Sequence, residues 1–155
     1  MAIPVLEQVK VQAQVLVPLV KALRTELGEE RANALVKKAL GDQFRQFGRE
    51  WWHRRGAGNL GEKLESLWEN FAAGDALDYE VLKKSPEAFE INVTECRYAK
   101  FFQELGEPEL GFLLVCGQDY TFAEGFGSGV DLKLTQTIMQ GAGHCDFRYR
   151  LKKQD

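Results

Sequence analysis

The chain has 155 residues, a length typical of one domain, and we expect residues 1–155 to fold as a single domain. It carries 20 Lys and Arg against 23 Asp and Glu, a formal net charge of −3, so a nucleic acid partner is not expected. Apolar residues make up 45% and charged residues 28%, which is typical of a soluble globular protein rather than a disordered chain.

The first half, residues 1–75, is predicted to be helical. Apolar residues recur at helical spacing over 9–27, and Pro18 inside this pattern is expected to kink the helix or to split it in two. A second helix is predicted over 29–55, with cationic residues in its last turn and a glycine beyond. A third apolar stripe predicts a helix over 60–71.

In the second half, residues 76–155, the spacing of apolar residues changes from a helical period to alternation. Apolar and polar residues alternate over 89–93, which predicts a half-buried strand, and 79–84 is predicted to be an earlier strand paired with it. A helix is predicted at 95–105 with Thr94 as its N-cap, and another at 108–123, in which 112–115 could instead be a buried strand. A glycine-rich loop at 125–129 then leads to a predicted hairpin of strands 130–138 and 145–151.

These elements predict an α+β fold in which the N-terminal helices pack on one face of a small antiparallel sheet. No apolar stretch is long enough for a membrane span, and no signal peptide is recognisable at the N-terminus. The three cysteines are an odd number without a closely spaced pair, which does not fit a secreted disulfide framework. We therefore expect a cytoplasmic protein with free thiols and no membrane partner.

The last predicted strand carries a cysteine on its inner face. Cys145 alternates with Phe147 and Tyr149, so its side chain is expected to point toward the helices, as a small buried hydrophobe or as part of a site. Gln136 is predicted to lie on the same inner face, where a polar side chain needs a partner. This combination suggests a partly wet pocket between the sheet and the helices, unless Gln136 bonds exposed backbone at the end of the hairpin.

The two other cysteines lie in predicted helices. Cys116 and Asp119 are three positions apart and would share one helix face, with Tyr120 one step further round. A carboxylate beside a thiol can act as a general base, although its charge disfavours the thiolate. Cys96 lies in the first turn of its helix, where peptide N–H groups stabilise a thiolate, and Arg97 adds positive potential. Each of these residues also has a purely structural interpretation, as a packed thiol or a solvated charge.

The two histidines are weaker candidates. His144 is predicted at the return of the hairpin, on the strand face opposite Cys145. His53 lies in a basic and aromatic helix end, which could bind an anion or could be a solvated end whose aromatic side chains pack on the next helix. The three cysteines with His144 could ligate zinc by ligand type, but they lack short-spaced pairs, so neither a metal nor a cofactor is expected.

The C-terminal half resembles a known family. The segments that carry the resemblance are, in order, Cys96-Arg97-Tyr98-Ala99, Leu105-Gly106, Cys116-Gly117-Gln118-Asp119, Gly125-Phe126, the stretch from Thr135 to Gly141, and Cys145-Asp146-Phe147-Arg148. Over about residues 88–150 this pattern is similar to the L-2-amino-thiazoline-4-carboxylic acid hydrolase family, and the leading helices fit its helical N-terminal part more loosely.

The resemblance implies hydrolytic opening of a cyclic amidine, in which water adds at the carbon between nitrogen and sulfur. Such a reaction needs an activated nucleophile, a proton donor for the ring nitrogen and a cation for the substrate carboxylate. The resemblance then implies Asp119 as base or orienting carboxylate, Cys116 or Cys145 as nucleophile, and Cys96 as a further pocket residue. Arg148 or Arg97 would hold the substrate carboxylate.

Other functions remain open at this point. The sequence faintly resembles vinyl reductase-type ligand-binding domains, so a small-molecule-binding or sensing module is an alternative, and a thiol-ligated metal protein is another. The partner expected from the sequence is a small molecule. A homodimer is also plausible, because the N-terminal helices carry more apolar surface than a small sheet can cover.

Overall fold

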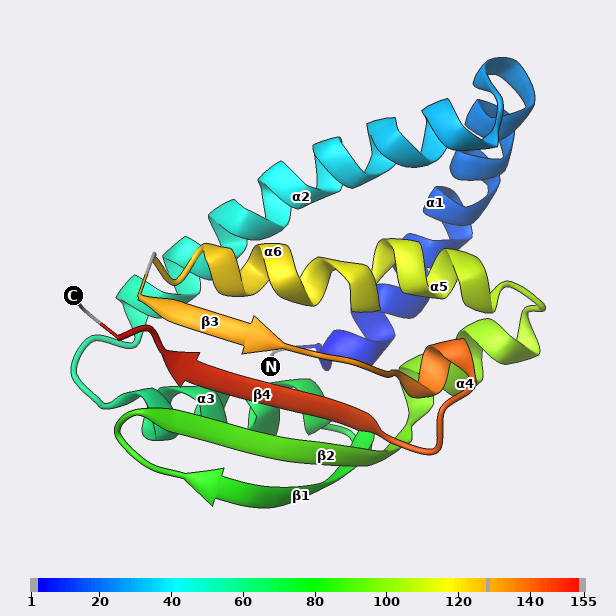
Figure 1. Cartoon of the computed structure of the whole chain (residues 1–155). Coiled ribbons are helices and arrows are strands. Elements are labelled where there is room, and N and C mark those ends of the chain that lie inside the picture. Colours follow the sequence, from blue (N-terminus) through cyan, green and yellow to red (C-terminus); the bar gives the residue numbers. More distant parts are fainter. Residues whose placement is uncertain (1–2, 128, 154–155) are drawn as a thin grey trace.

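The computed structural model describes residues 3–127 and 129–153. The first half is helical and the second half mixes strands with shorter helices, as Figure 1 shows. The elements in chain order are α1 (Val5–Leu27), α2 (Glu29–Arg54), α3 (Leu60–Ala72), β1 (Leu77–Lys84), β2 (Ala88–Cys96), α4 (Arg97–Glu104), α5 (Pro108–Leu114), the 3₁₀ turn η1 (Cys116–Gln118), α6 (Asp119–Glu124), β3 (Val130–Lys133), the 3₁₀ turn η2 (Ile138–Gln140) and β4 (Cys145–Leu151).

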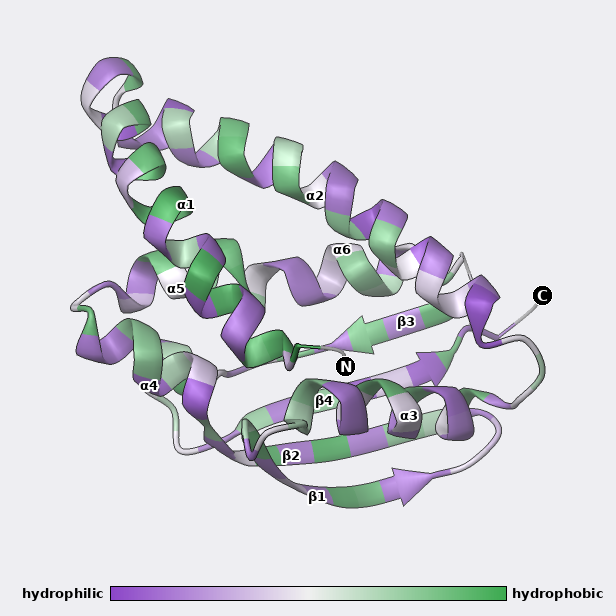
Figure 2. Cartoon of the chain, turned by 180° about the vertical axis from the view of Figure 1, so that it is seen from behind, coloured by the Kyte–Doolittle hydropathy of each residue, from purple (hydrophilic) through white to green (hydrophobic). Residues whose placement is uncertain are grey.

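The four strands form one antiparallel sheet in the order β1-β2-β4-β3. All the helices lie on the same face of this sheet (Figures 1 and 2), so the predicted α+β class with helices on one face is confirmed. The inner face is apolar because alternate residues of the two central strands, such as Ile91, Val93 and Phe147, point into the core. The predicted pairing of the strand at 79–84 with the strand at 89–93 is also confirmed.

The long N-terminal helix continues through its proline. Pro18 lies inside α1, so the expectation of two separate helices is wrong. Proline removes one backbone hydrogen bond, but the turns on either side are held by apolar packing, since Ala13 and Val20 are buried. At Gly28, whose φ of 84° suits glycine, the chain turns into α2. Figure 1 shows α1 and α2 diverging from this turn, with α6 lying between α2 and β3.

Helix α3 has the N-terminal cap that its sequence indicates. The Asn59 side chain accepts a hydrogen bond from the Glu62 backbone N–H, and the Glu62 carboxylate accepts one from the Asn59 backbone N–H. The helix buries Leu64, Leu67 and Trp68 against the inner face of the sheet. It therefore covers the half of the sheet formed by β1 and β2.

The segment predicted as one helix over 108–123 is interrupted in its middle. Helix α5 ends at Val115, whose φ of −121° and ψ of −71° depart from helical values, and the chain then forms η1 and α6. The alternative of a buried strand at 112–115 is wrong as well. The interruption places Cys116 at the start of a tight turn and Asp119 at the first position of the next helix.

The C-terminal hairpin is shorter than predicted on one side. Strand β3 ends at Lys133, because the backbone N–H groups of Thr135 and Gln136 donate to the Asp146 side-chain carboxylate and not to a backbone carbonyl of β4. The chain then enters η2, capped by the Thr137 side chain. The predicted loop at 125–129 precedes β3, and Ser128 in it lies outside the described residues.

Within residues 3–127 and 129–153, no helix is long and apolar enough to cross a membrane.

Candidate functional site

A cavity of about 130 Å³ lies between α1, the inner face of the sheet and the segment from α4 to α6. Its walls come from parts of the chain that are far apart in sequence, from Val5 at the start of α1 to Phe147 in β4. Most of the lining is aliphatic or aromatic. The polar or ionisable side chains in the lining are Gln12, Cys96, Tyr98, Cys116, Asp119, Thr137 and Cys145.

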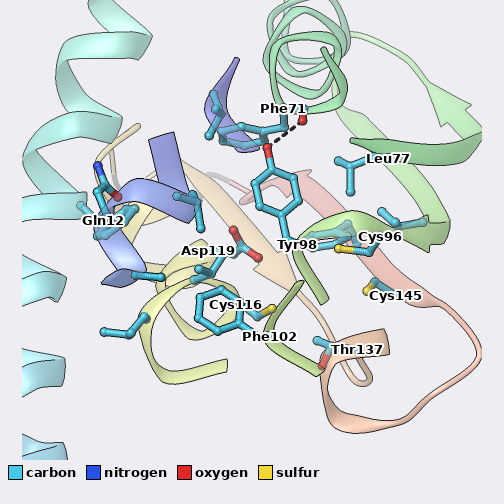
Figure 3. Close-up of a pocket in the computed structure, with 18 of the residues that line it drawn as sticks. Gln12, Phe71, Leu77, Cys96, Tyr98, Phe102, Cys116, Asp119, Thr137 and Cys145 are labelled. Carbon is cyan, nitrogen blue, oxygen red and sulfur yellow. Dashed lines mark hydrogen bonds between the residues drawn. The ribbon is translucent and has the colours of Figure 1, made fainter. Parts of the chain in front are cut away.

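Asp119 is the central polar group of the cavity, as Figure 3 shows. Its position at the start of α6 directs the carboxyl group into the apolar space, and its side chain has no hydrogen bond with any described residue. The side chain is half-buried, because the surface it exposes faces the cavity. Burial raises the pKa of Asp119 to about 8 from its ordinary value of 3.8. The Asp119 side chain is therefore a mostly neutral carboxylic acid at neutral pH.

All three cysteines line this one cavity. The Cys96 sulfur caps α4 by accepting the Ala99 backbone N–H at 3.4 Å, and the Cys145 sulfur accepts the Ile138 N–H at 3.2 Å. Thr94, the predicted cap of that helix, lies within β2 instead, and its hydroxyl donates to the Asp78 carbonyl. The sequence thus predicted a cysteine at the helix start but placed the cap two residues early.

Burial keeps the thiols protonated. It raises the pKa of Cys145 to about 11, and burial together with the Asp119 charge raises the pKa of Cys116 well above its ordinary value. The pKa of Cys96 is also raised by burial, although the backbone N–H groups of Ala99 and Tyr98 oppose this shift. A thiolate in this cavity therefore requires a base or a bound cation.

Three polar lining residues, Gln12, Tyr98 and Thr137, were not singled out by the sequence. The Tyr98 hydroxyl donates to the Phe71 carbonyl oxygen at 2.8 Å, and burial raises the pKa of Tyr98 (Figure 3). The Thr137 hydroxyl donates to the Gln140 side chain. Tyr98 follows Cys96 by two positions, and this proximity was the available signal. Gln12 and the other α1 residues carry no such signal, since their spacing is that of any amphipathic helix.

Five residues expected to bind substrate do not line the cavity: Gln136, His144, Tyr120, Arg148 and Arg97. Strand β3 ends before Gln136, so Gln136 does not lie on the inner face, and its side-chain amide donates to the His144 carbonyl at 3.1 Å. Gln136 therefore does not make the expected pocket partly wet; it bonds backbone near the end of the hairpin, as in the alternative interpretation. The Tyr120 hydroxyl donates to the Leu134 carbonyl and accepts the Leu134 N–H.

The two arginines expected to hold a carboxylate lie elsewhere. Arg148 alternates with the inward residues of β4, and its guanidinium donates to the Ile91 carbonyl and to the Asn92 side chain at 2.7 and 2.9 Å. Arg97 is exposed at the start of α4. No Lys, Arg or His is among the described residues that line the cavity.

The basic and aromatic end of α2 has a packing role. Trp52 stacks on Phe126 with ring centroids 4.7 Å apart, and Trp51 contacts the same ring at 6.0 Å. Lys63 lies over the outer side of the Trp52 ring. These contacts match the alternative in which the aromatic side chains pack on a neighbouring element. In the described part of the chain, no group of three or more His, Cys, Asp or Glu side chains is arranged to hold a metal ion.

A family model matches residues 8–149, which is nearly the whole chain and extends the resemblance well into the N-terminal helices. The family is described as L-2-amino-thiazoline-4-carboxylic acid hydrolase. The chain belongs to this family. No curated protein sequence matches it.

Solved structures of other proteins are similar to this chain. One is the phenol-responsive sensory domain of the transcription activator PoxR with phenol, with a TM-score of 0.55 and 13% identity over 88% of this chain and 72% of the other. A second is a trafficking protein particle complex subunit 3 from Naegleria fowleri covalently bound to palmitic acid, with a TM-score of 0.48 and 15% identity over 93% and 97% of the two chains.

Proposed function

We propose that this protein is a hydrolase that opens the ring of a small cyclic amidine of the thiazoline type. The observation that supports this proposal is the Asp119 carboxyl group, which stands without a hydrogen bond partner among the described residues in an apolar cavity lined by three thiols. An amidinium group is planar and carries N–H donors, so it can pair with an isolated carboxylate as a guanidinium does. Family membership agrees with this chemistry.

Cys116 is the thiol we assign as the nucleophile. The sulfurs of Cys96 and Cys145 accept backbone N–H groups, and those bonds fix them to the fold. For Cys116, the Asp119 charge is the largest influence on the pKa after burial, whereas for Cys96 and Cys145 backbone N–H groups have a larger influence than that charge. Cys116 and Asp119 thus form a nucleophile and base pair in which each group needs the other to act.

In the first step, the Cys116 sulfur attacks the amidine carbon and its proton passes to the Asp119 carboxylate. A C–S bond to Cys116 forms, the ring C–S bond breaks, and the released ring sulfur takes the proton from Asp119.

In the second step, water adds to the same carbon and gives one proton to Asp119. The bond to Cys116 then breaks, and its sulfur takes that proton back. The net reaction consumes one water, yields a substituted urea with a free thiol, and releases to solvent the proton that the amidinium carried.

The direct test is to incubate the protein with 2-amino-2-thiazoline and to measure the mercaptoethyl urea by liquid chromatography and mass spectrometry. Wild-type protein is expected to form the product, and Asp119→Asn and Cys116→Ser are each expected to reduce the rate at least about a hundredfold, the usual size of an acid–base contribution. Acid quenching should trap an amidino adduct on Cys116. Full activity in both variants would refute the assignment.

A second candidate function is a non-enzymatic sensing module. The apolar lining and the small volume of the cavity favour it, and a phenol-responsive sensory domain shares the fold. In that case a small apolar ligand would raise the melting temperature without being consumed. Stabilisation by 2-amino-2-thiazoline with no product over hours would favour this candidate over the hydrolase.

We also propose that the chain forms a homodimer and resides in the cytoplasm. The dimer proposal rests on the apolar stripe that α1 exposes, and the location rests on the free thiols.

A further inference from the structure

The cavity restricts the substrate more narrowly than the family description does. We infer that this protein takes small cyclic amidines that lack a carboxylate, and that it excludes the 4-carboxylate of the thiazoline ring. This inference rests on the proposed function for its reaction, but its central claim concerns which ligand the cavity admits. It follows from the charge of the lining, the volume of the cavity and the positions of the arginines.

The charge of the lining opposes an anion. The ionisable groups around the cavity are acids: Asp119, Tyr98 and the three cysteines. A carboxylate that enters loses its hydration, and no cation among the described lining residues replaces it. If Asp119 is ionised to hold the amidinium, the second carboxylate also experiences a like charge in an apolar space. The same Asp119 carboxylate would favour a cationic amidine.

The volume of the cavity fits the bare ring. An apolar cavity of about 150 Å³ in another protein holds one benzene molecule. The cavity here measures about 130 Å³, and 2-amino-2-thiazoline has as many non-hydrogen atoms as benzene. A carboxylate adds half as many atoms again. The larger ligand exceeds this volume, and Phe102, one of the aromatic walls, is buried and packed against the Phe101 ring.

The two arginines that could have held a carboxylate lie outside the cavity. The Arg148 guanidinium is bonded to Ile91 and Asn92, and neither Arg148 nor Arg97 is part of the cavity lining. Bringing the Arg148 guanidinium into the cavity would require it to leave those two acceptors and cross the sheet. The structure therefore offers the carboxylate no guanidinium partner among the described residues of the site.

Amidine binding should be linked to pH through Asp119. Its carboxyl must lose a proton before it pairs with an amidinium, and its pKa in the empty cavity is raised to about 8. The groups that face it are Cys96 and Tyr98 at the start of α4, Cys116 in η1, and Cys145 and Tyr149 in β4, and burial raises the pKa of each. All five stay neutral below about pH 8, so Asp119 alone sets the pH dependence in that range.

The experiment compares three probes by isothermal titration calorimetry with wild-type protein. They are 2-amino-2-thiazoline, its 4-carboxylate, and 2-methyl-2-thiazoline, which keeps the size but lacks the amidine. The amidine is expected to bind at least about tenfold more tightly than its carboxylate. Its affinity should rise about tenfold per unit between about pH 6 and pH 7, with uptake of the released proton by the buffer. Binding of the methyl compound should not gain affinity in that range.

The outcomes separate this inference from the proposed function. Tighter or equal binding of the carboxylate overturns the inference, even if the protein hydrolyses it. The expected order of binding without any product upholds the inference on ligand class and overturns the hydrolase proposal. Asp119→Asn, if it folds, should lose the pH dependence and the preference for the amidine over the methyl compound. The wild-type series distinguishes these outcomes even without that variant.

Discussion

Asp119 and Cys116 show how one position in the chain sets the chemistry of another. The Asp119 carboxyl is placed in an apolar space and becomes hard to ionise, and its charge in turn disfavours the thiolate of Cys116. Both groups are therefore mostly protonated at neutral pH. A bound amidinium is expected to favour both ionised forms, because its positive charge stabilises the Asp119 carboxylate and a neighbouring thiolate.

The raised pKa of Asp119 has a measurable effect on stability. The folded state holds this proton more tightly than the unfolded state, so the contribution of Asp119 is fully present below about pH 4 and is lost as the pH rises toward 8. The loss amounts to at most about 1.4 kcal/mol per pH unit. Asp119→Asn cannot ionise, so its free energy of unfolding should rise relative to the wild type between pH 5 and pH 8.

Urea denaturation at several pH values would measure this difference. The exposed Asp131→Asn is the matched control, and its curve should run parallel to that of the wild type. Parallel curves for Asp119→Asn as well would show that the carboxyl is not buried as the structure describes.

The cap of α4 allows a prediction at the single sulfur of Cys96. Cys96→Ser keeps an acceptor for the Ala99 N–H, whereas Cys96→Ala removes it, so the serine variant should be more stable by about 1 kcal/mol. The same pair of substitutions at Cys116, whose sulfur caps no helix, should show no advantage for serine. Thermal unfolding of the four variants checks the prediction, and equal stability of both Cys96 variants would contradict it.

At the residue scale, the sequence predicted part of the candidate site. The spacing of Cys116 and Asp119 placed them together, and strand alternation placed Cys145 on the inner face, and all three line the cavity. Gln136 was misplaced because alternation does not reveal where a strand ends. The competing acceptor is the Asp146 carboxylate, which takes the backbone N–H of Gln136 and ends the ladder.

At the scale of elements, two glycines set how closely α2 and α6 approach. A Cβ atom at Gly48 would overlap the carbonyl oxygen of Phe122, and one at Gly125 would overlap the carbonyl oxygen of Arg45. These glycines let the backbone of α6 lie directly against α2. Because Asp119 opens α6, the same close packing fixes the direction of the catalytic candidate.

Gly48→Ala should therefore force the two helices apart and lower the free energy of unfolding by about 1–3 kcal/mol or more. Gly41→Ala on the same helix is the control, since its Cβ would meet the Thr121 methyl at an ordinary 3.4 Å. That variant should be neutral or slightly more stable through its helix propensity. Denaturant titration of both variants tests this, and equal effects would refute the proposed contact.

The periodicity of apolar residues predicted most of the helices and strands, but not where packing overrides local pattern. The apolar stripe of 108–123 continues across Val115, so nothing local marks the break between α5 and α6. The same holds for Pro18, where packing of α1 maintains a helix that the residue alone would interrupt. In each case the deciding contacts come from elements distant in sequence.

At the scale of the whole molecule, α1 has two apolar faces. Its inner face closes the cavity, and its outer face exposes Val11, Val15 and Leu19, which are 64%, 66% and 52% exposed and spaced one turn apart. A stripe of this kind is typical of a contact between chains. The sequence-based prediction of a homodimer is therefore best tested at these residues.

Light scattering after size-exclusion chromatography should give the mass of two chains for the wild type and of one chain for Val15→Lys. Gln14→Lys, an exposed polar position on the same helix, should stay dimeric. A monomeric wild type at high concentration would refute the prediction of a dimer.

The position of β4 in the sheet also bears on how the protein is made. This strand follows the other three in sequence, yet it lies between β2 and β3 and brings Cys145 and Phe147 to the cavity. The contacts that close the cavity therefore join residues separated by most of the chain, and such contacts form late in folding. A chain emerging from the ribosome has neither the complete sheet nor the cavity until β4 has left the exit tunnel.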